Sequence, residues 1–137
     1  MNNNVVDDKV IASVCKIIDE VSFAGTDSVV PSTLEGKCVQ DADRLDAMGT
    51  IGIARTFAYG GSKGRRIHDP DIKLMTKMNK ADYHQNHNST SINHFNEKLL
   101  LLKDMINTES AKKMAEHRQA VMEEYLVEFL AEWEGEK

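Results

Sequence analysis

Three aspartates, Asp41, Asp43 and Asp46, fall within six residues of a segment with helical spacing. Carboxylates are ligands for divalent metals, and burying them is costly unless a cation or hydrogen-bond donors compensate. On a helix, Asp41 shares a side with Leu45, whereas Asp43 shares the opposite side with Val39. We therefore expect both sides to be buried and the helix to be central. The spacing fits equally well aspartates that face water or cap neighbouring helices.

A basic, glycine-rich region follows the aspartates directly. Residues 47–68 contain no Asp or Glu but carry Arg55, Lys63, Arg65 and Arg66 among five glycines. Glycines let the backbone approach an anion closely, and arginine binds phosphate through two hydrogen bonds. The pattern suits a phosphorylated ligand held beside a metal, although an ordinary basic loop would have the same composition.

The elements that would position these residues are helical, and the chain is expected to be an all-α single domain spanning residues 1–137. Apolar residues at helical spacing and capping signals predict the elements. The expected helices cover residues 7–23, about 33–48, a short stretch ending at 60–61, 92–106, and a last helix after 108. Residues 62–88 are polar and are expected to form a long, partly structured excursion.

Composition narrows the function. With 137 residues and 41% hydrophobic content, the chain can bury one core, and its net charge of -5 argues against binding nucleic acid. It has no apolar run long enough to span a membrane and no signal-peptide pattern, so we expect a cytoplasmic protein without membrane contact. Cys15 and Cys38 lack metal-binding spacing and are expected to be free, buried thiols.

Longer stretches carry a family resemblance. The runs 39–47 (Val-Gln-Asp-Ala-Asp-Arg-Leu-Asp-Ala) and 49–61, together with 92–95, 97–100 and Asn107-Thr108, resemble bacterial HD-domain phosphohydrolases of the nucleotide pyrophosphohydrolase type. The resemblance covers nearly all of the chain from about Asp7. It implies a helical HD-domain-like bundle.

The resemblance also implies a chemistry. Members bind a divalent metal such as manganese or magnesium through a His, a His-Asp pair and a later Asp in an Ala-Asp-Arg setting. This assigns the metal ligand to Asp43, with Asp41 as the fallback ligand and both Asp41 and Asp46 as candidates for positioning water. The expected reaction is hydrolysis of phosphoester or phosphoanhydride bonds in nucleotide-type substrates. The basic residues Arg55, Lys63, Arg65 and Arg66 would hold the phosphates.

The earlier His and His-Asp motifs have no counterpart in this sequence. His68-Asp69 follows the aspartates instead of preceding them, and Pro70 disfavours a helix there. His84 and His87 lie in a polar run that suggests a loop. We therefore expect an HD domain that is incomplete at its N-terminus, with weak or absent metal binding and impaired activity. Exposed apolar faces would favour self-association, and the alternative function is a non-catalytic nucleotide- or anion-binding module.

Overall fold

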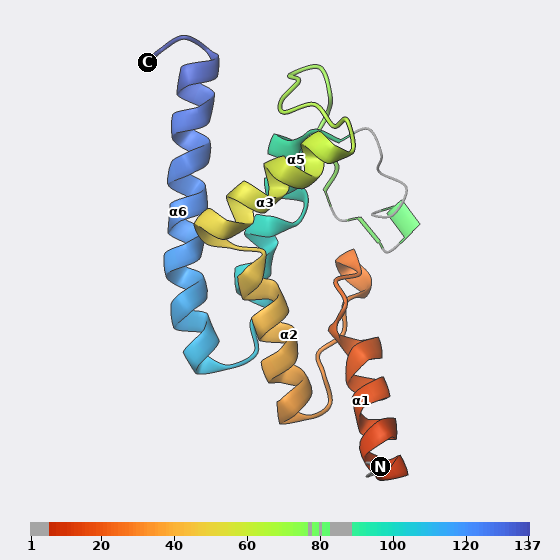
Figure 1. The fold of residues 1–137 in the computed structure, drawn as a ribbon. Helices are drawn as coiled ribbons and strands as arrows, with labels where there is room; N and C mark the ends of the chain where they lie inside the picture. Colours follow the sequence, from red (N-terminus) through yellow and green to blue (C-terminus); the bar gives the residue numbers. More distant parts are fainter. Residues whose placement is uncertain (1–5, 77, 80, 83–88) are drawn as a thin grey trace, which may run out of the picture.

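The described part of the chain is all-α, as predicted (Figure 1). A computed structural model describes residues 6–76, 78–79, 81–82 and 89–137. Its elements are α1 (Asp8–Val21), η1 (Gly25–Asp27), α2 (Leu34–Asp46), α3 (Gly49–Ser62), α5 (Ser91–Glu97), η2 (Leu99–Met105) and α6 (Glu109–Trp133). The expected helix over 92–106 is divided at Lys98 into α5 and the 3-10 helix η2. Nothing within the described ranges is both long and apolar enough to cross a membrane.

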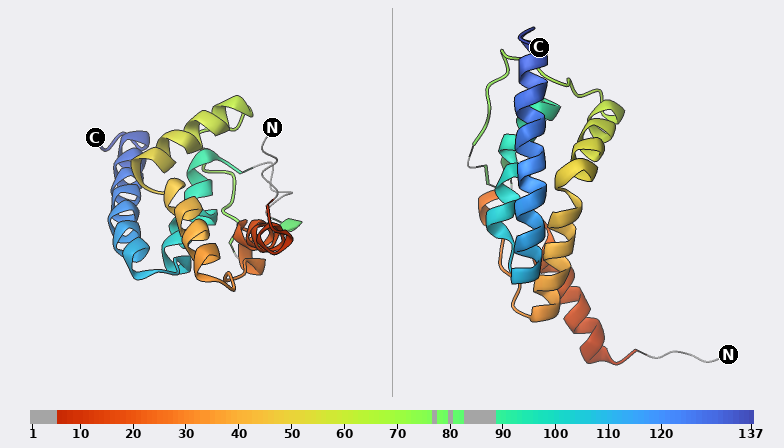
Figure 2. Two further views of the ribbon diagram at one scale, coloured as in Figure 1. Left: turned by 60° about the horizontal axis from the view of Figure 1, so that its bottom comes forward. Right: turned by 90° about the vertical axis from the view of Figure 1, so that its left-hand side faces the viewer.

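The helices surround one apolar core beside the long helix α6. Helices α2 and α3 and the 3-10 helix η2 all pack against α6, and α1 packs against α2 on the side away from α6 (Figures 1 and 2). Phe95 and Met122 are completely buried in this core. The core cluster comprises Leu45, Met48, Ile92, Phe95, Leu99, Leu102, Ile106, Ala111, Ala115, Met122 and Leu126.

Side-chain caps define where the helices begin. The Thr33 hydroxyl accepts a hydrogen bond of 3.0 Å from the Gly36 amide, which confirms the predicted start of α2. Thr90 caps α5 in the same way through the Asn93 amide. Both cysteines are free, as predicted, but they are exposed, so the prediction that they are buried is wrong. The His84 and His87 prediction lies outside the described residues.

The corner between α2 and α3 is tight. Gly49 has a φ of 69°, a left-handed conformation that favours glycine, and Arg118 of α6 donates a hydrogen bond to the Leu45 carbonyl at the end of α2. A Cβ added at Gly52 would lie 2.2 Å from the Ala47 carbonyl oxygen. Backbone therefore occupies the space that any larger residue at Gly52 would need.

This close approach predicts opposite outcomes for two glycines of α3. Gly52→Ala should destabilise the protein by about 1 to 3 kcal/mol, because the corner must open to admit the methyl group. Gly61→Ala meets nothing within 4 Å and should be neutral or stabilising by up to about 1 kcal/mol. Urea unfolding of both variants measures the difference, and equal stabilities would contradict the steric explanation.

Candidate functional site

Asp41 is the buried member of the acidic cluster, with only 2% of its surface exposed. One of its carboxylate oxygens accepts hydrogen bonds from the Asn107 amide and side chain, and the other accepts from the Thr108 amide and hydroxyl, all at 2.8 Å. Burial alone would raise the pKa of Asp41, but these four hydrogen bonds outweigh it and hold the pKa below its ordinary value of 3.8. The carboxylate stays charged and caps the start of α6.

Arg44 supplies part of the positive charge that a buried carboxylate requires. Its side chain is buried and donates to the Met105 carbonyl, which joins α2 to the end of η2. Burial lowers the pKa of Arg44, while the nearby charges of Asp41 and Asp43 raise it. The guanidinium Nε is buried without a hydrogen-bond partner among the described residues, so the arginine stabilises this region mainly through charge and its single carbonyl contact.

Asp43 and Asp46 lie on the exposed side of α2. The expectation that both sides of α2 are buried is therefore wrong: α6 and α1 pack against different sides of the helix, but Val39 and Asp43 remain exposed. Asp46 forms an exposed ion pair with Arg55 of α3. No ion pair or hydrogen bond engages the Asp43 carboxylate in the described part of the chain, so this carboxylate is available to a ligand.

The predicted phosphate-binding residues are spread along α3 and the segment after it. Arg55 lies eight residues before Lys63, about 12 Å along the helix axis. Lys63 ends α3 and lies 5.8 Å from the centre of the Tyr59 ring. Arg66 pairs with Asp69, whereas Arg65 is half-buried close to His94. The structure therefore brings Arg55 next to the acidic cluster and places the other three basic residues at the far end of α3.

Two histidine side chains lie in different environments. His68, in the rejected His-Asp pair, lies edge-on to Trp133 and Phe129 at the end of α6. His94 of α5 is largely buried, and burial together with the charges of Lys98 and Arg65 lowers its pKa to about 4. His94 is consequently neutral at physiological pH.

The described residues supply only part of the ligand set that a catalytic metal needs. Among the residues that the structure describes, no three His, Cys, Asp or Glu side chains are grouped closely enough to hold a metal ion. A catalytic metal normally needs about three protein ligands and an open position. Asp43 fits as one such ligand, but the described residues do not complete the set. An apolar pocket of about 370 Å³ lies elsewhere, between η1, α5 and η2, and none of the predicted site residues lines it.

The sequence interpretation missed the partners of Asp41. Asn107 and Thr108 precede α6 as its capping residues, yet the Thr108 side chain does not cap its own helix. Gln40 is fully buried and donates to the carbonyls of Glu20 and Val29 while accepting from Asn107. The available signal was the Asn-Thr pair itself, because a helix start needs acceptors for its free amides.

The fold is shared with solved proteins. A Lactobacillus plantarum protein of known crystal structure is 43% identical, with a TM-score of 0.88 over 98% of this chain and 63% of its own. An HD-superfamily hydrolase from Bacillus thuringiensis is 41% identical, with a TM-score of 0.62 over 97% of this chain and 67% of its own. At this identity and coverage, the chain belongs to the same family as this HD-superfamily hydrolase.

One crystal structure of a curated relative contains a nucleotide ligand. Bacillus subtilis YpgQ, an uncharacterised protein, is 37% identical over 115 residues, which are 82% of this chain and 48% of YpgQ. A crystal structure of YpgQ in complex with ADP has a TM-score of 0.68 to this chain, at 34% identity over 93% of it and 54% of YpgQ. The chain thus spans about half the length of this relative. No protein-family model matches the chain.

Substitutions of the two aspartates should have different effects on the free energy of unfolding. Asp41→Asn should lower the free energy of unfolding by about 2 to 4 kcal/mol at pH 7, because the amide nitrogen would face donors instead of accepting from them. The exposed control, Asp43→Asn, should change it by less than about 0.5 kcal/mol. The deficit of Asp41→Asn relative to wild type should shrink as the pH falls below about 3.8, because the unfolded wild-type chain then takes up a proton at Asp41 while the folded carboxylate, with its lowered pKa, resists protonation. A deficit that is the same at pH 3 and pH 7 would contradict this role.

The lowered pKa of His94 predicts acid sensitivity in a separate window. Because the unfolded state takes up the proton near pH 6.5 and the folded state only near pH 4, stability is complete above pH 6.5 and falls between these values. Wild type should lose about 2 to 3 kcal/mol between pH 7 and pH 4.5 through this group. His94→Gln should lack this loss, whereas the exposed control His117→Gln should retain it in urea titrations at both pH values.

Proposed function

We propose that the chain forms part of a metal-dependent phosphohydrolase that cleaves phosphoester or phosphoanhydride bonds of nucleotide-type substrates. The observation that carries the proposal is the division of the acidic segment. The Asp41 carboxylate is already occupied by hydrogen bonds from the residues at the start of α6. Asp43, two residues later, presents an exposed carboxylate without an ion pair among the described residues. An HD-superfamily hydrolase with the same fold supports this interpretation.

The role of each residue follows from its environment. Asp43 would be one ligand of a divalent metal, which when bound would activate water and offset phosphoryl charge. Asp46 holds Arg55 on the same exposed side of the α2–α3 corner, so Arg55 is positioned to approach an anion near Asp43. The buried Asp41 would position Asp43 through the shared helix and take no part in the chemistry.

The nucleotide class of substrate is supported by the ADP complex of YpgQ. Of the four basic residues, Lys63 and Arg65 form no ion pair with the described residues, and they would contact phosphates at the end of α3. Arg55 and Arg66 are already paired with carboxylates, and a phosphate would have to compete with Asp46 and Asp69 for them. We therefore assign the phosphate contacts first to Lys63 and Arg65.

The alternative function is a non-catalytic module that binds nucleotides or other anions. The observation that favours it is the lack of a three-ligand metal cluster among the described side chains. Under both proposals, the chain alone should bind ADP. The two differ in whether a divalent metal changes binding and whether phosphate is released.

Calorimetric titration with ADP tests the basic residues. The double substitution of Lys63→Ala and Arg65→Ala should weaken binding about tenfold, which corresponds to about 1.4 kcal/mol. Lys113→Ala, an exposed lysine on α6, is the matched control and should leave the affinity unchanged. If ADP does not bind, or if both sets of substitutions act equally, the assignment of the phosphate contacts is wrong.

Manganese separates the enzyme from the module. Mn²⁺ should strengthen ADP binding to wild type and to the control Asp71→Asn, but not to Asp43→Asn, because only the last removes the proposed ligand. Release of phosphate from nucleoside triphosphates by wild type, at least tenfold above Asp43→Asn, would establish the enzyme. Binding that ignores Mn²⁺ and is followed by no release would favour the module.

A further inference from the structure

Helix α1 is amphipathic, but its apolar side is left largely uncovered. No residue of α1 is buried, although the helix carries six branched aliphatic side chains over 14 residues. Four of them are about half exposed or more: Val10 at 51%, Ile11 at 48%, Val14 at 50% and Ile18 at 64%. An isolated helix of this length is marginally stable in water, and in proteins such helices gain most of their stability by packing an apolar face.

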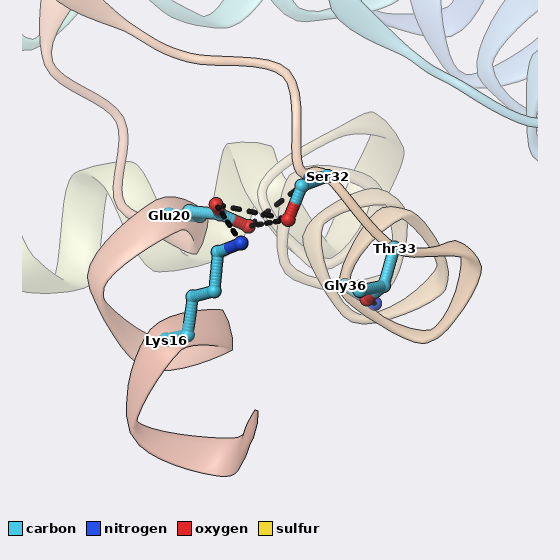
Figure 3. A network of polar contacts seen from close by, with 5 residues as sticks. All are labelled: Lys16, Glu20, Ser32, Thr33 and Gly36. Carbon is cyan, nitrogen blue, oxygen red and sulfur yellow. Dashed lines mark hydrogen bonds and ion pairs between the residues drawn. The ribbon is translucent and has the colours of Figure 1, made fainter. Parts of the chain in front are cut away.

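Polar contacts, by contrast, hold α1 in place at its C-terminal turn (Figure 3). The Glu20 carboxylate accepts hydrogen bonds from the amide and hydroxyl of Ser32, and Lys16 lies 3.9 Å from the same carboxylate. The Glu20 carbonyl also accepts from the buried side chain of Gln40 in α2. These contacts fix the direction of α1 while its first turns extend beyond the start of α2 (Figure 2).

The neighbouring side of α2 extends the uncovered surface. Val39 of α2 is 49% exposed. We name the five residues Val10, Ile11, Val14, Ile18 and Val39 the α1–α2 apolar surface. Exposed aliphatic residues concentrated on two adjacent helices are characteristic of surfaces that another segment covers.

The lengths of the relatives indicate what covers this surface. The Lactobacillus plantarum relative shares the fold of this chain with a TM-score of 0.88, so it places equivalent helices in equivalent positions. More than a third of its chain lies outside the match, and more than half of YpgQ does. That additional chain is long enough to lie over α1 and α2 within one molecule.

We propose that the α1–α2 apolar surface is a docking site for the part of the domain that these relatives contain outside the matched region. This is a different occupant from a second copy of the chain. A second copy would place two net acidic helices together, because residues 7–21 carry four carboxylates and two lysines. The inference concerns assembly and holds whether or not the protein hydrolyses nucleotides.

Co-expression tests the proposal directly. The unmatched part of the Lactobacillus plantarum relative is produced with an affinity tag beside this full chain, without added metal or nucleotide. The two polypeptides should purify together in a 1:1 ratio. Failure to purify together, or a homodimer of this chain that excludes the tagged polypeptide, would overturn the proposal.

Substitutions locate the contact. Val14→Lys and Ile18→Lys should each weaken the complex at least tenfold, because they place a charge in an apolar contact while lysine retains good helix propensity. Val14→Met, which keeps the surface apolar, should preserve it. The control Val127→Lys changes a residue of α6 that is 68% exposed and should have no effect. Circular dichroism verifies that each variant keeps its helices, and equal binding by all four variants would contradict the location.

A single-chain version covers the case in which the tagged part is insoluble alone. The unmatched part is joined to this chain by a flexible linker, and amide hydrogen exchange is followed in α1. Exchange in residues 10–18 should slow at least tenfold relative to the unfused chain, and Val14→Lys should reverse the slowing. Unchanged exchange in the fusion would overturn the proposal. Because neither readout involves Mn²⁺ or ADP, failure here is distinct from failure of the proposed function.

Discussion

The contact between Asp41 and the start of α6 is the constraint on which the rest of the structure depends. One carboxylate accepts four hydrogen bonds from Asn107 and Thr108, and its negative charge lies at the positive end of a 25-residue helix. This contact fixes α2 along α6. Arg118, returning from α6 to the end of α2, closes a second connection at the corner that leads into α3. The exposed side of α2 is thereby held in a defined orientation.

The helices could be predicted from the sequence because their signals are local. Apolar spacing and the hydroxyl of Thr33 give the position of α2, and the all-α class follows from similar patterns along the chain. The covered side of α2 could not be predicted, since apolar residues such as Leu45 and Val39 occur on both sides of it. Only the location of α6 decides between them. For the same reason, periodicity did not distinguish the buried Asp41 from the exposed Asp43.

The surroundings of the basic residues could likewise not be predicted from the sequence. Its composition indicated a concentration of positive charge, but the structure separates Arg55 from the other three basic residues. Composition also does not reveal that Arg55 and Arg66 have carboxylate partners within reach. These exposed pairs are individually weak, so they orient the arginines more than they stabilise the fold. The lowered pKa of His94 depends on burial against elements distant in sequence, which local patterns do not report. The roles assigned to Lys63 and Arg65 remain predictions.

The charged residues of the segment Asp41-Ala42-Asp43-Arg44 meet two different requirements, one of the fold and one of the proposed metal site. Asp41 and Arg44 are required by the fold through their buried contacts, whereas the Asp43 carboxylate makes no ion pair or hydrogen bond with the described residues. A chain without catalytic activity would still need two of the three charged residues, Asp41 and Arg44, for its fold. Similarity at Asp41 and Arg44 therefore reflects the fold, and of the three charged residues only Asp43 would report on the proposed metal site.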